Sequence, residues 1–174
     1  VGNSNPFTLI AGLNVLESEK VIEKVISQCV EVTRKLKIPY VFKASYDKAN
    51  RSSIDSYRGP GLDEGLTILS DLKRDFKVPI ISDIHSVEEV SKASEVLDII
   101  QIPAFLSRQT DLIREAASTK IPLNIKKGQF MAPEDAVNII KKCEYFGNKQ
   151  IMICERGSSF GYNNLVVDML GMVK

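Results

Sequence analysis

Residues 79–102, PIISDIHSVEEVSKASEVLDIIQI, decide the fold class of this chain. They contain a short apolar run at Pro79–Ser82, a helical pattern from Val87 to Val96 and a second apolar run at Asp98–Ile102. Short apolar runs rich in isoleucine are typical of strands that are covered on both faces. The stretch therefore predicts a strand, a helix and a second strand, which is the repeating unit of a parallel α/β fold.

The same alternation runs along the rest of the chain. Further strands are predicted at Phe7–Ala11, Tyr40–Lys43, Pro122–Ile125 and Gln150–Cys154. Further helices are predicted over Glu19–Leu36, Leu66–Phe76, Leu112–Ala117 and Ala136–Cys143, the last with Pro133 in its first turn, and a sixth is expected to start near Asn164. Two architectures fit this order: an open doubly wound sheet and a (β/α)8 barrel. No GxGxxG motif follows a predicted strand, which removes the main support for a dinucleotide-binding open sheet.

Polar residues gather just after the predicted strands. In chain order these positions hold Asn14 and Glu17; Lys43, Ser45, Lys48, Asn50, Arg51 and Ser52; Asp83 and His85; Gln101; Lys126 and Lys127; and Glu155 and Arg156. The carboxyl ends of parallel strands open onto one face, and that face carries the chemistry of such folds. At least five cations belong to it, namely Lys43, Lys48, Arg51, Lys126 and Arg156. Because clustered cations repel one another unless anions balance them, we predict small, phosphorylated, acidic substrates.

Each of these residues also has an ordinary structural role open to it. A single lysine at a strand end is more often solvated than functional, and Asn50 could form a turn. Glu17 could cap the first helix from its opening turn. His85, the only histidine, could be a hydrogen-bonded structural residue, but its position two residues after Asp83 favours the site.

The composition argues against several classes of protein. Of the 174 residues 44% are hydrophobic and 26% charged, as in ordinary globular domains. The net charge is +1 with the signs interspersed, which argues against a nucleic-acid surface. The longest apolar runs are far shorter than the ~18 residues of a membrane span, and the amino terminus shows no secretory pattern. Cys29, Cys143 and Cys154 form no CxxC pair, so we expect reduced thiols in a cytoplasmic protein.

A specific family resemblance rests on the eleven residues 43–53, KASYDKANRSS. This stretch resembles the signature of the 3-deoxy-D-manno-octulosonate 8-phosphate synthases. Six other segments resemble the same family in order and at family spacing: NVLES (14–18), YRGPG (57–61), SDIH (82–85), QIPAFLSRQTDL (101–112), NIKKGQF (124–130) and ERGSSFGYNNLVVD (155–168). The resemblance thus covers essentially the whole chain.

The resemblance implies a (β/α)8 barrel that assembles as a homotetramer in the cytoplasm. It implies condensation of phosphoenolpyruvate with D-arabinose 5-phosphate, with release of inorganic phosphate, on the route to lipopolysaccharide. By matching motif, phosphoenolpyruvate would be held by Lys43, Ser45, Lys48, Gln101, Lys126 and Arg156. The sugar phosphate would be held by Asn50, Arg51 and Ser52, and the reacting centre would be lined by Asp83 and His85. We expect Lys126 to act as a proton donor or an electrostatic stabiliser.

Asn14 bears on the requirement for a metal. Members of the family that require a metal carry cysteine at this position, where the thiolate is a strong ligand for divalent transition metals. An amide is a poor replacement, so the resemblance implies a metal-independent enzyme with no cofactor. We hypothesise that Asn14 positions the attacking water or the sugar by hydrogen bonding.

Length is the main departure from the family, because six strands are predicted where a closed barrel needs eight. We therefore expect one (β/α) barrel domain over residues 1–174 that lacks the C-terminal part of the barrel. Three rival functions stay open. One is the related synthase that uses erythrose 4-phosphate, whose Pro-Arg-Thr motif differs from residues 49–52 here. The others are a non-catalytic phosphosugar-binding fragment and a Schiff-base aldolase, which needs a lysine of lowered pKa.

Overall fold

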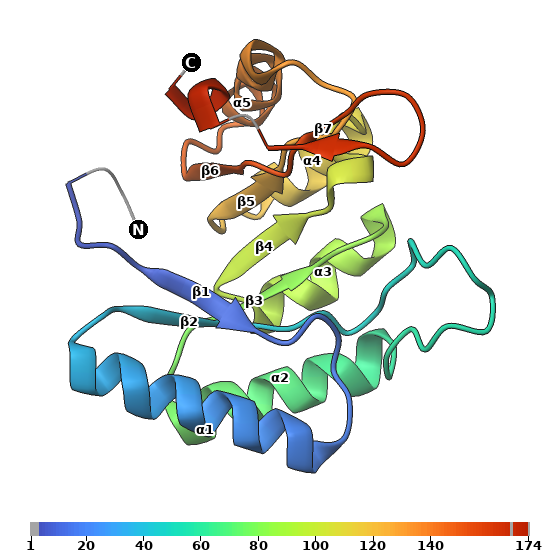
Figure 1. The fold of residues 1–174 in the computed structure, drawn as a ribbon. Coiled ribbons are helices and arrows are strands. Elements are labelled where there is room, and N and C mark those ends of the chain that lie inside the picture. Colours follow the sequence, from blue (N-terminus) through green and yellow to red (C-terminus); the bar gives the residue numbers. More distant parts are fainter. Residues whose placement is uncertain (1–3, 168, 174) are drawn as a thin grey trace. The chain divides into compact units, whose positions relative to one another are not determined.

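The computed structural model describes residues 4–167 and 169–173 (Figure 1). The chain forms two compact units, each of which contains parallel strands and helices. The first unit comprises the chain up to Asp83 together with Glu95–Asp98. The second comprises Ile84–Ser94 together with the chain from Ile99 onward. The prediction of an α/β protein with parallel strands is confirmed in both.

The first unit alternates three strands with two helices. In chain order its elements are β1 (Leu9–Gly12), α1 (Glu19–Leu36), β2 (Tyr40–Lys43), α2 (Leu62–Phe76) and β3 (Ile80–Asp83). The strands β1, β2 and β3 pair in parallel in this order, with Leu9 opposite Tyr40 and Phe42 opposite Ile80. Figure 1 shows α1 and α2 running together along the same side of β1 and β2. The carboxyl ends of β2 and β3 therefore lie beside each other in this unit.

The second unit continues the alternation. Its elements are α3 (Val87–Val96, of which Val87–Ser94 lie in this unit), β4 (Ile99–Ile102), α4 (Thr110–Ser118), β5 (Leu123–Lys126), α5 (Ala136–Tyr145), β6 (Ile151–Cys154), β7 (Ser158–Ser159) and β8 (Leu165–Val166). Short 3-10 helices occur at Ala104–Leu106, Pro133–Asp135 and Met169–Val173. β4, β5 and β6 pair in parallel, whereas β7 and β8 form an antiparallel hairpin.

Predicted elements agree with the structure except at the C-terminal end. All six predicted strands are present with bounds shifted by at most two residues, and Pro133 begins the 3-10 helix that leads into α5. The helix expected near Asn164 is wrong, because β8 and a 3-10 helix occupy this region instead. Asn163 has a φ of 56° and Gly161 a φ of 65°, so the chain turns there in left-handed conformations that break a helix. The β-branched pair Val166 and Val167 then favours extended backbone.

The core explains why the strands are so uniformly apolar. All four residues of β3 and all four of β4 are buried. On α1 the buried residues Ile22, Ile26, Val30 and Thr33 recur every three or four positions, as expected for a helix that packs one face against a sheet. Within residues 4–167 and 169–173, no helix is both long enough and apolar enough to cross a membrane.

Gly65 on α2 allows close packing of the loop that follows β2. A Cβ at Gly65 would lie 2.3 Å from the Cβ of Tyr46, whose side chain is fully buried. Alanine is the better helix former by about 1 kcal/mol, but the clash with a packed core residue typically costs about 1–3 kcal/mol or more. We expect Gly65→Ala to lower the free energy of unfolding, measured by urea denaturation, whereas Ser70→Ala at an exposed site of α2 should not. A stabilised Gly65→Ala protein would contradict this packing.

Cys143 on α5 is a buried thiol, and all three cysteines are free. Burial raises the pKa of Cys143 from about 9 to about 11, and burial also raises the pKa of Tyr40. A group whose pKa is raised on folding stabilises the protein below its unfolded pKa, and this contribution is lost as the pH rises toward the folded pKa. We expect the free energy of unfolding to fall between about pH 9 and about pH 11, and to fall less steeply in Cys143→Ala. Urea denaturation at a series of pH values measures this free energy. The same pH dependence in the parent and in Cys143→Ala would contradict the prediction.

Candidate active site

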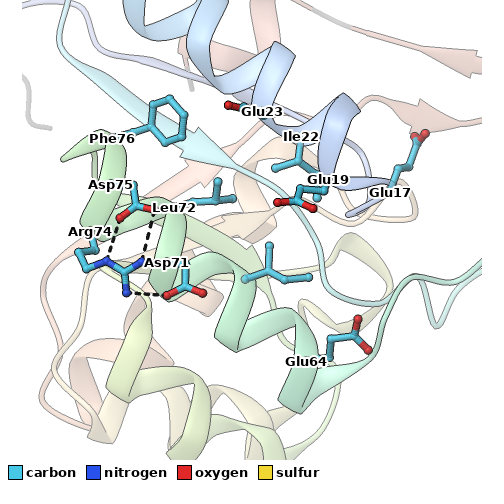
Figure 2. A pocket seen from close by; sticks show the side chains of 11 residues that line it. Glu17, Glu19, Ile22, Glu23, Glu64, Asp71, Leu72, Arg74, Asp75 and Phe76 are labelled. Carbon is cyan, nitrogen blue, oxygen red and sulfur yellow. Dashed lines mark hydrogen bonds and ion pairs between the residues drawn. The ribbon is translucent and has the colours of Figure 1, made fainter.

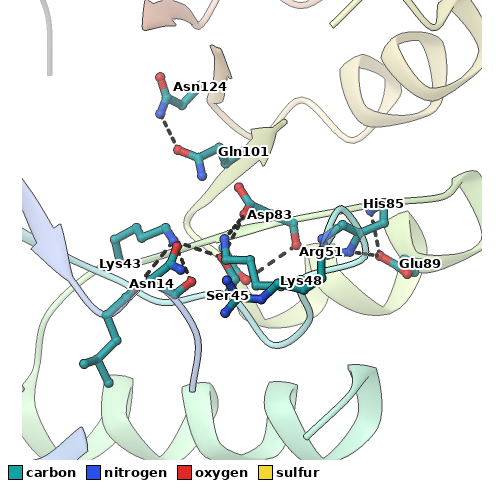
Figure 3. Close-up of polar contacts among 12 residues, drawn as sticks. Asn14, Lys43, Ser45, Lys48, Arg51, Asp83, His85, Glu89, Gln101 and Asn124 are labelled. Carbon is teal, nitrogen blue, oxygen red and sulfur yellow. Dashed lines mark hydrogen bonds and ion pairs between the residues drawn. The ribbon is translucent and has the colours of Figure 1, made fainter. Parts of the chain in front are cut away.

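Four polar side chains meet at the carboxyl ends of β2 and β3 in the first unit (Figure 3). The Lys43 ammonium donates to Ser45 Oγ at 2.9 Å, and the Lys48 ammonium donates to the same oxygen at 2.8 Å. Ser45 Oγ donates to Asp83 Oδ2 at 2.7 Å, and Lys48 Nζ lies 2.9 Å from that oxygen. We call these four residues the Lys–Ser–Asp cluster. A hydroxyl has one proton and two lone pairs, so Ser45 uses its full hydrogen-bonding capacity here.

The Lys–Ser–Asp cluster combines burial with an excess of positive charge. Ser45 is fully buried, and Lys48 and Asp83 are 8% and 3% exposed. Charges removed from water interact more strongly with one another than exposed charges do. Since the cluster has two ammonium groups and one carboxylate, an anion is the ligand that would balance its charge.

Backbone hydrogen bonds fix the loop after β2 and with it the position of Ser45. The Leu16 N–H donates to Ser45 O at 2.9 Å, and the Lys48 N–H donates to Arg58 O at 2.8 Å. The Arg58 guanidinium donates from Nε to Asp47 Oδ1 at 2.8 Å and binds the second oxygen of the same carboxylate. The loop is therefore held from the segment before α1 and from the segment before α2.

The backbone carbonyl oxygen of Asn14 contacts Lys43 of the Lys–Ser–Asp cluster. Lys43 Nζ lies 3.3 Å from both Leu13 O and Asn14 O, and the Leu13 N–H donates to Lys43 O at 2.8 Å. Asn14 itself is exposed. Across residues 4–167 and 169–173, no group of three or more His, Cys, Asp or Glu side chains could hold a metal ion.

The predicted sugar-binding residues lie in an exposed turn after the cluster. The Arg51 N–H donates to Lys48 O at 3.2 Å, and Arg51 Nε donates to Tyr57 O at 3.2 Å. Asn50 and Ser52 flank Arg51 and are exposed. The structure thus groups Lys43, Ser45, Lys48 and Asp83 directly, and it places the sugar-binding residues in the exposed segment that follows.

In the second unit a buried amide pair joins β4 to β5. The register places Gln101 opposite Asn124, and Asn124 Nδ2 donates to Gln101 Oε1 at 2.9 Å. Lys126 ends β5 and is partly exposed, and Arg156 follows β6 and is exposed. The predicted phosphoenolpyruvate residues of this unit therefore occupy the carboxyl ends of β4, β5 and β6.

Lys127 is a buried cation that joins two loops of the second unit. It is 2% exposed. Its Nζ donates to the carbonyl oxygens of Gly128 at 3.2 Å, Met131 at 3.3 Å and Gly157 at 2.9 Å. Glu155 Oε1 lies 3.8 Å away. The ammonium thus ties the loop after β5 to the loop after β6.

His85 contacts a carboxylate from the first turn of α3. His85 Nδ1 lies 3.2 Å from Glu89 Oε2, and the His85 backbone N–H donates to the same oxygen at 2.8 Å. Figure 3 shows the ring and the carboxylate facing each other. His85 therefore has a defined orientation in the second unit.

Comparison with known proteins identifies the family of this sequence. The sequence model that describes the DAHP synthetase I family matches residues 1–174. The chain belongs to the DAHP synthetase I family.

Curated relatives are similar over nearly the whole chain. A 2-dehydro-3-deoxyphosphooctonate aldolase of Hahella chejuensis is 61% identical over 171 residues, which are 98% of this chain and 61% of that protein. Proteins of the same name from Marinobacter nauticus and Pseudomonas aeruginosa are 60% and 58% identical with the same coverage. The chain therefore spans about three fifths of the length of the curated relatives it matches.

Sequence reasoning does not identify two polar partners in this member of the DAHP synthetase I family. Asn124 was available as a polar residue inside a predicted apolar strand, but its pairing with Gln101 depends on strand register. Glu89 stands three residues after Ser86, which is the spacing of a capping box at a helix start. That spacing would have placed Glu89 near the residues before α3, and thus near His85.

A separate cleft of about 510 Å³ lies along α1 and α2 of the first unit (Figure 2). Its carboxylates are Glu17, Glu19, Glu23, Glu64, Asp71 and Asp75. Arg74 binds Asp71 at 2.7 Å and Asp75 at 2.8 Å. A wall of carboxylates repels anions, so this cleft is not a candidate site for the anionic ligand that the Lys–Ser–Asp cluster favours.

Proposed function

We propose that this member of the DAHP synthetase I family condenses phosphoenolpyruvate with D-arabinose 5-phosphate, giving 3-deoxy-D-manno-octulosonate 8-phosphate and inorganic phosphate. The observation that carries the proposal is the Lys–Ser–Asp cluster, in which two ammonium groups converge on one buried hydroxyl at the strand ends. The choice of substrates is supported by the relatives, which are named for the same phosphorylated eight-carbon keto acid. The family resemblance of residues 43–53 agrees with this choice.

Within this proposal each unit contributes residues of defined roles. In the first unit Lys43, Ser45 and Lys48 hold phosphoenolpyruvate, and Asp83 fixes the serine and one of the lysines. Fixed cations stabilise charge on the departing phosphate and on the aldehyde oxygen as it becomes negative. The exposed segment Asn50–Ser52 holds the phosphate of the sugar, chiefly through Arg51 and Ser52.

The second unit supplies the remaining proposed groups. Gln101, Lys126 and Arg156 complete the binding of phosphoenolpyruvate, with Lys126 as proton donor or electrostatic stabiliser. His85 lines the reacting centre. Holding two anionic substrates in register replaces a bimolecular encounter with an oriented pair, which is a large source of rate enhancement.

We further propose that the reaction needs no metal and that Asn14 orients water or sugar. The support is chemical, because an amide replaces the thiolate that metal-requiring members carry at this position. The single barrel domain, the homotetramer and the cytoplasmic location are proposed from the same resemblance. Light scattering of the purified protein would measure the oligomeric state.

Phosphate release from phosphoenolpyruvate tests the proposed function. We expect release that depends on D-arabinose 5-phosphate, persists with a strong chelator and is absent with erythrose 4-phosphate. Release lost to the chelator would overturn the metal-independent assignment, and release with erythrose 4-phosphate would favour the rival synthase. Binding of both substrates by calorimetry without release of phosphate would favour a non-catalytic phosphosugar-binding role.

A further inference from the structure

The contact between His85 and Glu89 determines which ring nitrogen carries the proton. Glu89 Oε2 accepts from the His85 backbone N–H at 2.8 Å and lies 3.2 Å from His85 Nδ1. Both side chains are largely buried, with 12% and 20% exposure. An ionised carboxylate can only accept hydrogen bonds, so Nδ1 must carry a proton to bind it. In the neutral ring Nε2 then has no proton and acts as an acceptor.

We propose that Glu89 is a positioning residue that holds His85 in the Nδ1–H tautomer and fixes the orientation of its ring. Oε2 is itself anchored by the backbone N–H of the residue whose ring it binds, so one carboxylate oxygen contacts both the backbone and the ring of His85. The catalytic consequence rests on the proposed function, in which His85 lines the reacting centre. There the Nδ1–H tautomer makes Nε2 the hydrogen-bond acceptor of the ring.

A purely structural role for Glu89 is the competing explanation. Ser86 and Glu89 have the spacing of a capping box, and a carboxylate in the first turn of α3 stabilises a helix start by itself. A cap would require the backbone contact but would be indifferent to the tautomer of the ring. The position of the ring proton therefore separates the two roles.

The chain has a single histidine, which makes the tautomer directly measurable. In protein labelled with ¹⁵N-histidine, long-range ¹H–¹⁵N spectra at about pH 8.5, where an ordinary imidazole is neutral, should show a protonated Nδ1 and an unprotonated Nε2. Glu89→Ala should shift the ring toward the Nε2–H form that free histidine prefers in water. Glu89→Gln keeps an acceptor oxygen and should retain the Nδ1–H form.

Glu88→Ala is the matched control, because it removes the neighbouring carboxylate of the same helical turn. Glu88 is fully exposed and hydrogen-bonds with Ser86, which lowers the pKa of its carboxyl. The control should leave the His85 spectrum unchanged. A parent protein with the proton on Nε2, or on both nitrogens, would overturn the proposal. So would an unchanged Nδ1–H form in Glu89→Ala. If Glu89→Ala does not fold, the parent and Glu89→Gln spectra decide the question.

Steady-state kinetics of the Glu89 variants provide a second test. If the proposed reaction holds, Glu89→Ala should lower kcat by about 10–100-fold, the range found when a carboxylate that orients a metal-binding histidine is removed. KM should change little, and Glu89→Gln should retain most of the parent kcat. A normal kcat in a protein whose tautomer has shifted would remove the positioning role. The spectra are recorded without substrate, so they stand even if the proposed reaction fails.

Discussion

The Lys127→Met protein is expected to unfold with about 3–5 kcal/mol less free energy than the parent, the usual cost of removing one partner from a buried ionic network. Methionine is unbranched like lysine and fills most of its volume, but it cannot donate to the three carbonyl oxygens that Lys127 binds. Those carbonyls and the Glu155 carboxylate would lose their buried cation. Urea denaturation followed by circular dichroism measures the change.

Lys126→Met is the matched control, one residue earlier in the chain at the end of β5. Lys126 is partly exposed at the end of β5, so its loss should change stability by less than about 1 kcal/mol. Under the proposed function the same change should lower kcat by about 100-fold or more, because it removes a charge that stabilises the transition state. If Lys126→Met were the more destabilising of the two, the division of roles between these neighbouring lysines would be wrong.

Asp83→Ala should destabilise the first unit by a comparable amount, about 3–5 kcal/mol, because it leaves Lys48 as a buried cation without its ion-pair partner. Ser45 would also lose the acceptor for its hydroxyl proton. Asp83→Asn keeps the shape and one acceptor oxygen, so we expect a smaller loss of about 1–3 kcal/mol. Phosphate release should fall sharply in both proteins if the cluster binds phosphoenolpyruvate.

An exposed ion pair provides the comparison for Asp83. Asp71 binds Arg74 on the surface of α2, with side chains that are about half exposed or more. Asp71→Ala should change the free energy of unfolding by no more than about 1 kcal/mol. A double-mutant cycle of Asp83→Ala with Lys48→Met should recover part of the loss, since removing both charges leaves no uncompensated one. Additive effects would show that the pair is not coupled.

The sequence contains enough information for the elements but not for the side-chain pairings. The apolar runs predict β3 and β4 correctly because both strands are buried throughout. The parallel α/β class then places the polar residues after each strand at the carboxyl ends. The pairing of Gln101 with Asn124 depends on the register between β4 and β5, which no local pattern specifies.

Adjacent lysines pose the same difficulty. Lys126 and Lys127 both follow the predicted strand 122–125, and nothing in the sequence indicates that Lys127 is buried while Lys126 is partly exposed. The turn at Gly161–Asn163 depends on left-handed backbone that asparagine only sometimes adopts, and for this reason the helix expected near Asn164 is wrong.

The hydroxyl of Ser45 also has a consequence for ligand affinity. Lysine side chains are long and mobile, and fixing one costs up to about 2 kcal/mol of rotamer entropy. In the Lys–Ser–Asp cluster both ammonium groups already bind one oxygen, which is itself tied to Asp83. Such a preorganised receptor spends little of its interaction energy on ordering itself when an anion arrives. The folding of the loop after β2, and not the encounter with the ligand, bears that entropic cost.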